Sequence, residues 1–112
     1  MIPGDIILIN FSFTNPSLAK VRPAVIMALT ADKYSDLIVC AISSIVPSKP
    51  SSNEILIDKS STSFQKTGLR VDSVLKIDRI STLRRIDVIT TIGKCDKNLW
   101  SDVRLKFRNL IK

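Results

Sequence analysis

The sequence predicts a mainly β protein with one helix at its C-terminus, an α+β arrangement built on a small, strongly bent antiparallel sheet or barrel. Short runs of β-branched and aliphatic residues, separated by turn residues, continue as far as Ile92. Beyond them the apolar residues recur at helical spacing. At 112 residues the chain can build one hydrophobic core, and we expect a single domain over residues 1–112.

Four strands are expected in the first part of the chain, at residues 6–11, 22–29, 37–44 and 54–57. Each is rich in Val, Ile or Leu, and the segments between them carry the Gly, Pro, Asn, Asp and Ser residues that favour turns. Pro23 stands at the start of the second strand, where a missing N–H group is tolerated. Residues 58–68 contain few apolar side chains, so we expect irregular structure there with room for one helical turn.

Two more strands are expected, one around residues 73–77 and one at 87–92. Asp96 is then expected to cap a helix, because its carboxylate can accept hydrogen bonds from the free N–H groups of the first turn. The apolar residues that follow recur at i, i+4, i+8 and i+11 and define one stripe of an amphipathic helix. They are Leu99, Val103, Phe107 and Leu110.

The positive charge is concentrated in the second half of the chain. Up to Gln65, five cations balance five acids, whereas from Lys66 onward twelve cations face five acids and supply the whole net charge of +7. Such a field attracts polyanions such as RNA, DNA or an acidic protein segment.

The amino-acid composition limits which kinds of catalytic site, metal site and cellular location can be expected. The chain has no His, so imidazole catalysis and His-ligated metal sites are excluded, and its scattered acids form no convincing metal cage. Cys40 and Cys95 are far apart, with no Cys-x-x-Cys motif, and are expected to be reduced, with Cys40 a small buried apolar residue. No secretory signal and no stretch of about 20 apolar residues is present, so we expect a cytoplasmic protein without a membrane span.

The stretch KVRPAVIM places Arg22 and Pro23 directly before an apolar run, and VCAISS ends a second run in hydroxyl residues. An arginine fork grips phosphate bidentately and keeps its charge. Pro23 and the strand would hold Arg22 still. Without further information, however, an arginine at a strand edge is more simply a surface residue.

Taken in order, PGDIILINFSF, KVRPAVIM, VCAISS, DSVLKIDRISTL and the amphipathic C-terminal helix make the chain similar to the MazF/PemK toxins of bacterial toxin–antitoxin pairs. The resemblance implies an SH3-like small β-barrel of the MazF/PemK/CcdB type and a homodimer. It also implies a sequence-selective endoribonuclease (an mRNA interferase) that cuts single-stranded RNA without a metal or other cofactor. A cognate antitoxin with an acidic, disordered segment would hold it inactive.

The resemblance also assigns roles to individual residues. The catalytic arginine falls on Arg22, and the hydroxyl residue at the end of the third strand falls on Ser43, where Thr is usual. Ser44 would face the opposite side of the sheet, because neighbouring strand residues alternate. Asp78 is the third catalytic candidate. The cations expected to contact RNA are Lys20, Lys76, Arg79, Arg84 and Arg85.

Lys76 and Asp78 stand two residues apart on an expected strand and would share a face. They could form a simple ion pair, or a phosphate grip beside a proton acceptor. Many relatives carry Glu or His in the loop before Arg-Pro, but this chain has TNPSLAK there. Proton transfer would therefore rest on Asp78, Arg22 or water.

Two other functions stay open. A gyrase poison with the same fold binds a protein target through a C-terminal Trp-Gly-Ile tail, whereas this chain ends RNLIK. The third possibility is a basic RNA-binding relative that has lost catalysis, and the missing loop acid keeps it open.

Overall fold

The computed structural model describes residues 1–11 and 20–112. The loop TNPSLAK, on which the question of the missing Glu or His depends, therefore lies outside the described residues except for Lys20. The elements follow the order β1 (Asp5–Phe11), β2 (Lys20–Leu29), β3 (Leu37–Ser43), β4 (Glu54–Ile57), α1 (Phe64–Thr67), β5 (Ser73–Leu83), a 3₁₀ turn η2 (Arg85–Asp87), β6 (Val88–Lys94) and α2 (Lys97–Leu110).

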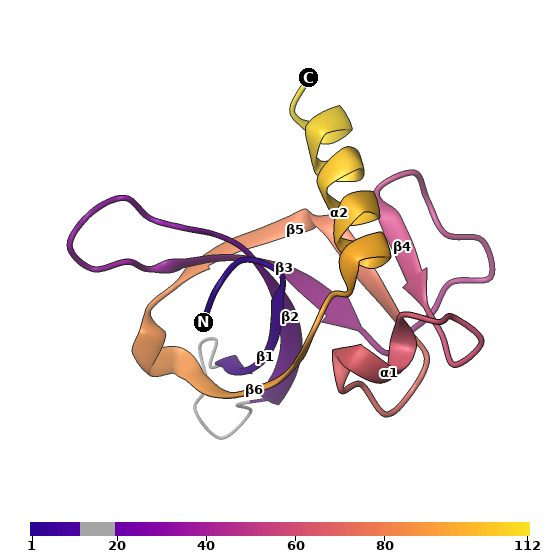
Figure 1. The fold of residues 1–112 in the computed structure, drawn as a ribbon, viewed down its shortest axis with the longest axis horizontal. Coiled ribbons are helices and arrows are strands. Elements are labelled where there is room, and N and C mark those ends of the chain that lie inside the picture. Colours follow the sequence, from indigo (N-terminus) through magenta and orange to yellow (C-terminus); the bar gives the residue numbers. More distant parts are fainter. Residues whose placement is uncertain (12–19) are drawn as a thin grey trace.

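All pairings between the strands are antiparallel, and they form one six-stranded sheet in the order β4-β5-β3-β2-β1-β6. The pairings β1–β6, β2–β3 and β3–β5 contain register shifts, and such bulges bend and twist a sheet. The strands curl accordingly, with α2 standing across them (Figure 1). The mainly β fold with a C-terminal helix is confirmed. Within the described residues the hydrogen bonding does not close the barrel, because β4 and β6 remain its two edges.

The sheet carries an apolar cluster on each face. The larger cluster joins the sheet to α2 and includes Ile6, Val25, Cys40, Leu75 and Leu99. The other face holds a smaller cluster made of Ile7, Ile9, Ala24, Ile26, Leu37 and Val39. The two sets alternate along β1 and β2, as side chains of a strand must.

The predicted helix is confirmed from its first residue. Asp96 is the N-cap, and its side chain accepts a hydrogen bond from the Leu99 N–H at 2.8 Å. Leu99 and Val103 are buried in the larger cluster, and the partly buried Phe107 and Leu110 pack against it. In the part of the chain that the structure describes, no helix combines the length and apolar character needed to cross a membrane.

The strand bounds differ most from expectation at β5, which extends to Leu83 rather than ending near Ile77. Its second half has three consecutive exposed residues, Asp78–Ile80, and such a run lacks the alternation of apolar and polar residues that identifies a strand in a sequence. β2 begins at Lys20, so Pro23 lies inside the strand. It is tolerated there because the pairing with β3 begins only at Ala24, which leaves one flank of the strand open at Pro23.

Two glycines hold α1 against β6. Gly68 ends α1 with a left-handed φ of 75°, and a Cβ atom there would lie 2.0 Å from the carbonyl oxygen of Ile92. A Cβ at Gly93 would lie 2.4 Å from the carbonyl oxygen of Lys66. Only glycine permits this close approach of two backbones. The segment that follows Gly68 is therefore fixed beside β6.

Both cysteines are free, as expected, and both are buried, although burial was predicted for Cys40 alone. Burial, together with the nearby charge of Asp78, raises the pKa of the Cys40 thiol to about 11. The Cys40 thiol donates a hydrogen bond to the carbonyl oxygen of Ile77 at 3.4 Å. Burial also raises the pKa of Cys95 to about 12, with Asp96 and Asp5 adding to the effect. Neither thiol is suited to nucleophilic chemistry at neutral pH.

Candidate functional site

The candidate site lies at the end of the sheet where β2 begins and β3 ends. Arg22 is half-buried on β2, and its backbone partner on β1 is Ile9. Ala24, two residues further along β2, pairs with Ala41 of the next strand, β3. Ser43 is two residues beyond Ala41, so alternation puts it on the same face as Arg22. Alternation thus puts the predicted arginine and hydroxyl on one face, each two residues beyond the last paired position of β2 and β3.

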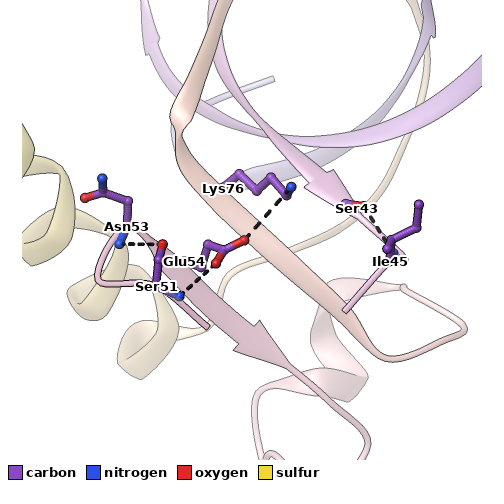
Figure 2. Close-up of polar contacts among 6 residues, drawn as sticks. All are labelled: Ser43, Ile45, Ser51, Asn53, Glu54 and Lys76. Carbon is purple, nitrogen blue, oxygen red and sulfur yellow. Dashed lines mark hydrogen bonds and ion pairs between the residues drawn. The ribbon is translucent and has the colours of Figure 1, made fainter. Parts of the chain in front are cut away.

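Ser43 has a defined local role at this strand end. Its hydroxyl oxygen accepts a hydrogen bond from the Ile45 N–H at 3.1 Å, and this leaves the hydroxyl proton available for donation to a ligand. Ile45 itself is 78% exposed, and Figure 2 shows it beside Ser43. The hydroxyl is therefore held in place by the backbone that follows it.

Lys76 reaches the same face from β5. Its backbone partners are Ala41 on β3 and Glu54 on β4, and its Nζ lies 4.0 Å from Oε2 of Glu54. Figure 2 shows the Lys76 side chain between Glu54 and the end of β3 that carries Ser43. The Ser51 N–H donates to Glu54 at 2.8 Å and, with the Ser51 hydroxyl and Lys76, lowers the pKa of that carboxyl. A carboxylate thus competes with any phosphate for Lys76.

Asp78 is separated from this group by a bulge. The β3–β5 pairing passes from Ala41↔Lys76 to Cys40↔Ile80, so Ile77 to Arg79 have no opposite residue on β3. Alternation therefore does not place Asp78 beside Lys76, and the ion pair that Lys76 makes is with Glu54 instead. The charge of Asp78 acts on Cys40, three residues before Ser43 along β3, a separation of about 10 Å.

The predicted RNA-binding cations fall into separate groups. Lys20 is exposed at the start of β2, near Arg22, whereas Arg79 is exposed within the β5 bulge. Arg84 and Arg85 lie past the far end of β5, because Leu83 pairs with Leu37, the first residue of β3. The length of β3 puts them about 20 Å from Ser43.

Both arginines at the far end make local contacts. Arg84 Nε lies 3.5 Å from Oδ2 of Asp87, and Arg85 Nε donates to the carbonyl oxygen of Ser35 at 3.0 Å. These contacts hold η2 and the loop between β2 and β3. The structure therefore does not bring Arg84 and Arg85 together with Arg22 and Ser43.

A pocket of about 540 Å³, the Arg22 pocket, opens at the same end of the sheet. It is lined by Leu8, Val21, Arg22, Pro23, Ile42, Ser44, Gly68, Leu69, Arg70, Val71, Ser73 and Ile92. The serine in this lining is Ser44, on the opposite face of β3 from Ser43. Alternation puts the other β2 residues of this lining, Val21 and Pro23, on the face opposite Arg22, so most of the strand residues in the lining belong to the face opposite Ser43.

Sequence reasoning missed Arg70 altogether. It is exposed on the segment that the Gly68–β6 contact fixes, and it is the second arginine of the pocket. The signal was present in the stretch GLRVD, where an arginine follows a glycine of left-handed conformation by two residues. Because the partner of that glycine is on β6, no local pattern placed Arg70 near Arg22.

The protein is thus a small curled antiparallel sheet with a C-terminal helix, and a pocket lined in part by two arginines opens at one end of the sheet. The profile of the family described as the PemK-like, MazF-like toxin of type II toxin–antitoxin systems matches residues 2–111. The chain therefore belongs to that toxin family, as the sequence analysis predicted. No curated protein sequence matches it.

Solved structures with this fold cover almost all of the chain. An endoribonuclease from a mycobacterial species, in complex with its cognate antitoxin, has a TM-score of 0.73 at 11% identity, over 99% of this chain and 94% of that one. A MazE–MazF structure from Deinococcus radiodurans has a TM-score of 0.73 at 17% identity, over 99% and 95%. The MazF-mt6 toxin of Mycobacterium tuberculosis has a TM-score of 0.67 at 17% identity, over 96% and 95%.

Proposed function

We propose that the protein is an endoribonuclease toxin that cleaves single-stranded RNA without a metal ion and is silenced by a cognate antitoxin. Membership of the toxin family supports this proposal, and two of the similar solved structures are described as toxin–antitoxin complexes. The observation that carries it is the presence of Arg22 and Ser43 on one face of the sheet, at the start of β2 and the end of β3, beside a pocket of about 540 Å³.

The proposed reaction needs no group beyond the RNA and the protein. The ribose 2′-oxygen attacks the adjacent phosphorus while the bond from phosphorus to the 5′-oxygen breaks. The products are a 2′,3′-cyclic phosphate and a free 5′-hydroxyl. One proton leaves the 2′-hydroxyl and one is delivered to the departing 5′-oxygen. The protein must stabilise the negative charge that builds up on the phosphoryl oxygens.

Arg22 is assigned to stabilise that negative charge. Its guanidinium can donate two parallel hydrogen bonds to the phosphoryl oxygens, and the pairing of β2 with β1 fixes its backbone. Ser43 is assigned as a further donor, since its oxygen already accepts the Ile45 N–H. Lys76 and Lys20 would neutralise flanking phosphates, with Arg79 further along β5.

Proton transfer needs one group that accepts the proton of the 2′-hydroxyl and one that protonates the departing 5′-oxygen. Asp78 is the assigned carboxylate, but it lies in the unpaired segment of β5, and its charge acts on Cys40, which is three residues or about 10 Å along β3 from Ser43. Substrate or water must therefore bridge that separation, or Arg22 and water must carry the protons. Arg84 and Arg85 lie at the far end of the sheet, so they can contact only an RNA that is long enough to extend there.

The test is cleavage of a single-stranded RNA pool by the purified protein in the presence of EDTA, with the new 5′ ends mapped. We expect Arg22→Ala to lower the rate constant by about 10²–10³, the usual loss on removing one preorganised donor. Lys49→Ala removes one exposed positive charge elsewhere and should cut like the wild type. Equal cutting by Arg22→Ala would contradict the site.

Binding of RNA without any product, in a wild-type protein that is folded, would favour the non-catalytic relative instead. A salt dependence of that binding would measure the number of phosphates neutralised. A homodimer and an acidic antitoxin segment complete the proposal. The antitoxin is expected to abolish cleavage at equimolar ratio.

A further inference from the structure

Arg70 is the second arginine of the Arg22 pocket, and the segment that carries it is held on both sides. Two residues before it, the backbone of Gly68 lies in close contact with β6. Two residues after it, the carboxylate of Asp72 accepts a hydrogen bond from the Lys59 N–H at 2.9 Å. Arg70 thus extends from a fixed backbone, which is what a side chain needs in order to recognise a ligand with defined geometry.

The Arg70 guanidinium is free to meet a ligand. Its side chain is exposed, and it forms no ion pair with any residue that the structure describes. None of the described residues that line the pocket is an acid. Because a guanidinium has five N–H donors and no acceptor, Arg70 selects a ligand edge that consists of acceptors.

Most of the remaining lining is aliphatic. The pocket volume of about 540 Å³ is typical of sites that enclose a small molecule. Two of its apolar side chains, Val21 and Val71, are 55% and 53% exposed. A phosphate group alone would leave these walls uncovered, whereas the flat faces of a nucleobase can pack against them. The more enclosed part of the wall is formed by Leu8, Pro23, Ile42, Leu69 and Ile92.

The donors of Arg70 distinguish between the four bases. Guanine presents O6 and N7 side by side, and an arginine fork binds this pair of acceptors bidentately. Adenine carries an amino group in place of O6 and would set N–H groups against N–H groups. Uracil has no two adjacent acceptors, and cytosine has a smaller ring system to cover the aliphatic walls.

We propose that the Arg22 pocket binds a guanine base of the RNA and that Arg70 is the residue that determines this specificity. The inference rests on the proposed function, because it names the base that the RNA-cleaving site selects. Arg22 also lines the pocket, so the guanine belongs to a nucleotide next to the phosphate that Arg22 stabilises. Cleavage is therefore expected beside guanine.

The first measurement is binding of single-stranded 2′-deoxy heptamers of uridine that carry one central test base, followed by fluorescence anisotropy. These probes lack the attacking hydroxyl, so they report recognition independently of cleavage. We expect guanine to be bound about 5- to 150-fold more tightly than adenine, the usual discrimination by one bidentate pair. Hypoxanthine keeps O6 and N7 and should bind like guanine, whereas 7-deazaguanine lacks N7 and should lose most of the advantage.

Three variants separate the arginine fork from its charge. Arg70→Ala should bind the guanine and adenine heptamers equally. Arg70→Lys keeps the charge without the fork, so it should lose most of the preference for guanine. The matched control Arg104→Ala removes an exposed arginine of α2 and should keep the full preference.

Several results would overturn the assignment of Arg70. Uniform weakening of all heptamers in Arg70→Ala would make Arg70 a phosphate contact. A wild-type protein that prefers cytosine, or no base at all, would also exclude a guanine pocket. Mapping of 5′ ends in a cleaved RNA pool then separates the two proposals. Cleavage without enrichment of guanine would refute the pocket assignment alone, whereas guanine-selective binding without any cleavage would refute the nuclease activity alone.

Discussion

Glu54 holds the Nζ of Lys76 at 4.0 Å, on the face of the sheet that also carries Ser43 and Arg22. Asp78 was the expected partner of Lys76, but Glu54 is the residue paired directly opposite Lys76 on β4, whereas Asp78 lies in the unpaired segment of β5. An ion pair at the edge of a candidate phosphate site weakens binding of the phosphate, because the lysine must leave one anion to meet another.

Glu54→Gln is therefore expected to strengthen RNA binding. A single ion pair near the surface contributes little, so the affinity should rise only modestly, by about 1.5- to 5-fold. The measurement is fluorescence anisotropy of a labelled single-stranded RNA at fixed salt. In a Lys76→Ala background the same substitution should have no effect, and a gain that persists there would show that Glu54 acts through another group.

Ser43 and Ser44 are expected to differ in their kinetic effects. Ser43→Ala should lower the rate constant for cleavage by about tenfold or more with little change in KM, because a donor to the phosphoryl group is lost. Ser43→Thr keeps the hydroxyl and should retain most of the activity. Ser44→Ala should act mainly on KM, since Ser44 lines the pocket. A loss of rate in the Ser44 variant alone would assign the catalytic hydroxyl to Ser44.

Gly68 is expected to tolerate no side chain. Gly68→Ala meets both a left-handed φ and a backbone oxygen of Ile92, so it should lower the free energy of unfolding by more than the roughly 1–2 kcal/mol that the backbone conformation alone costs. Gly4→Ala is the matched control, because its φ of 95° is also positive but its nearest neighbour is a Trp100 ring atom at 3.7 Å. Urea unfolding of the two variants should rank Gly68→Ala as the less stable. The reverse order would show that the backbones of α1 and β6 can move apart at little cost in free energy.

Asp96 is expected to make stability depend on pH in the acid range. The Leu99 N–H and the Ser63 hydroxyl donate to its carboxylate and lower its pKa from the ordinary value of 3.8. Its contribution is thus complete well above pH 4 and is lost as the pH falls through the lower pKa of the folded state. Asp96→Ala should cost about 1 kcal/mol of unfolding free energy at pH 7.

The difference between Asp96→Ala and wild type should shrink as the pH is lowered below the ordinary pKa of an aspartate. Urea unfolding at pH 7 and at about pH 2 measures it. Asp102→Ala, in the exposed middle of α2, removes a carboxylate without a cap and should show a much smaller effect at both pH values. A difference for Asp96→Ala that is unchanged in acid would show that packing, and not the ionised cap, is responsible.

Local patterns were sufficient where a residue acts on its own segment. Asp96 caps the helix that begins one residue later, and the Leu99 to Leu110 stripe packs against the larger cluster as its spacing predicted. The alternation in β2 and β3 likewise places Arg22 and Ser43 on one face once the strands are paired. The family resemblance carried by the Arg-Pro and Ile-Ser stretches is confirmed at the level of family and fold.

What depends on distant segments could not be predicted. The bulge between Cys40 and Ala41, the Glu54 partner of Lys76 and the position of Arg70 all arise where segments remote in sequence are paired or packed. Sequence periodicity records which side of a strand a residue occupies, but not which strand lies opposite. The sequence alone thus determined the elements, their apolar faces and the candidate Arg22 and Ser43. The tertiary structure decided which charges meet, because pairing register and backbone contacts such as Gly68 with Ile92 are set between segments and not within them.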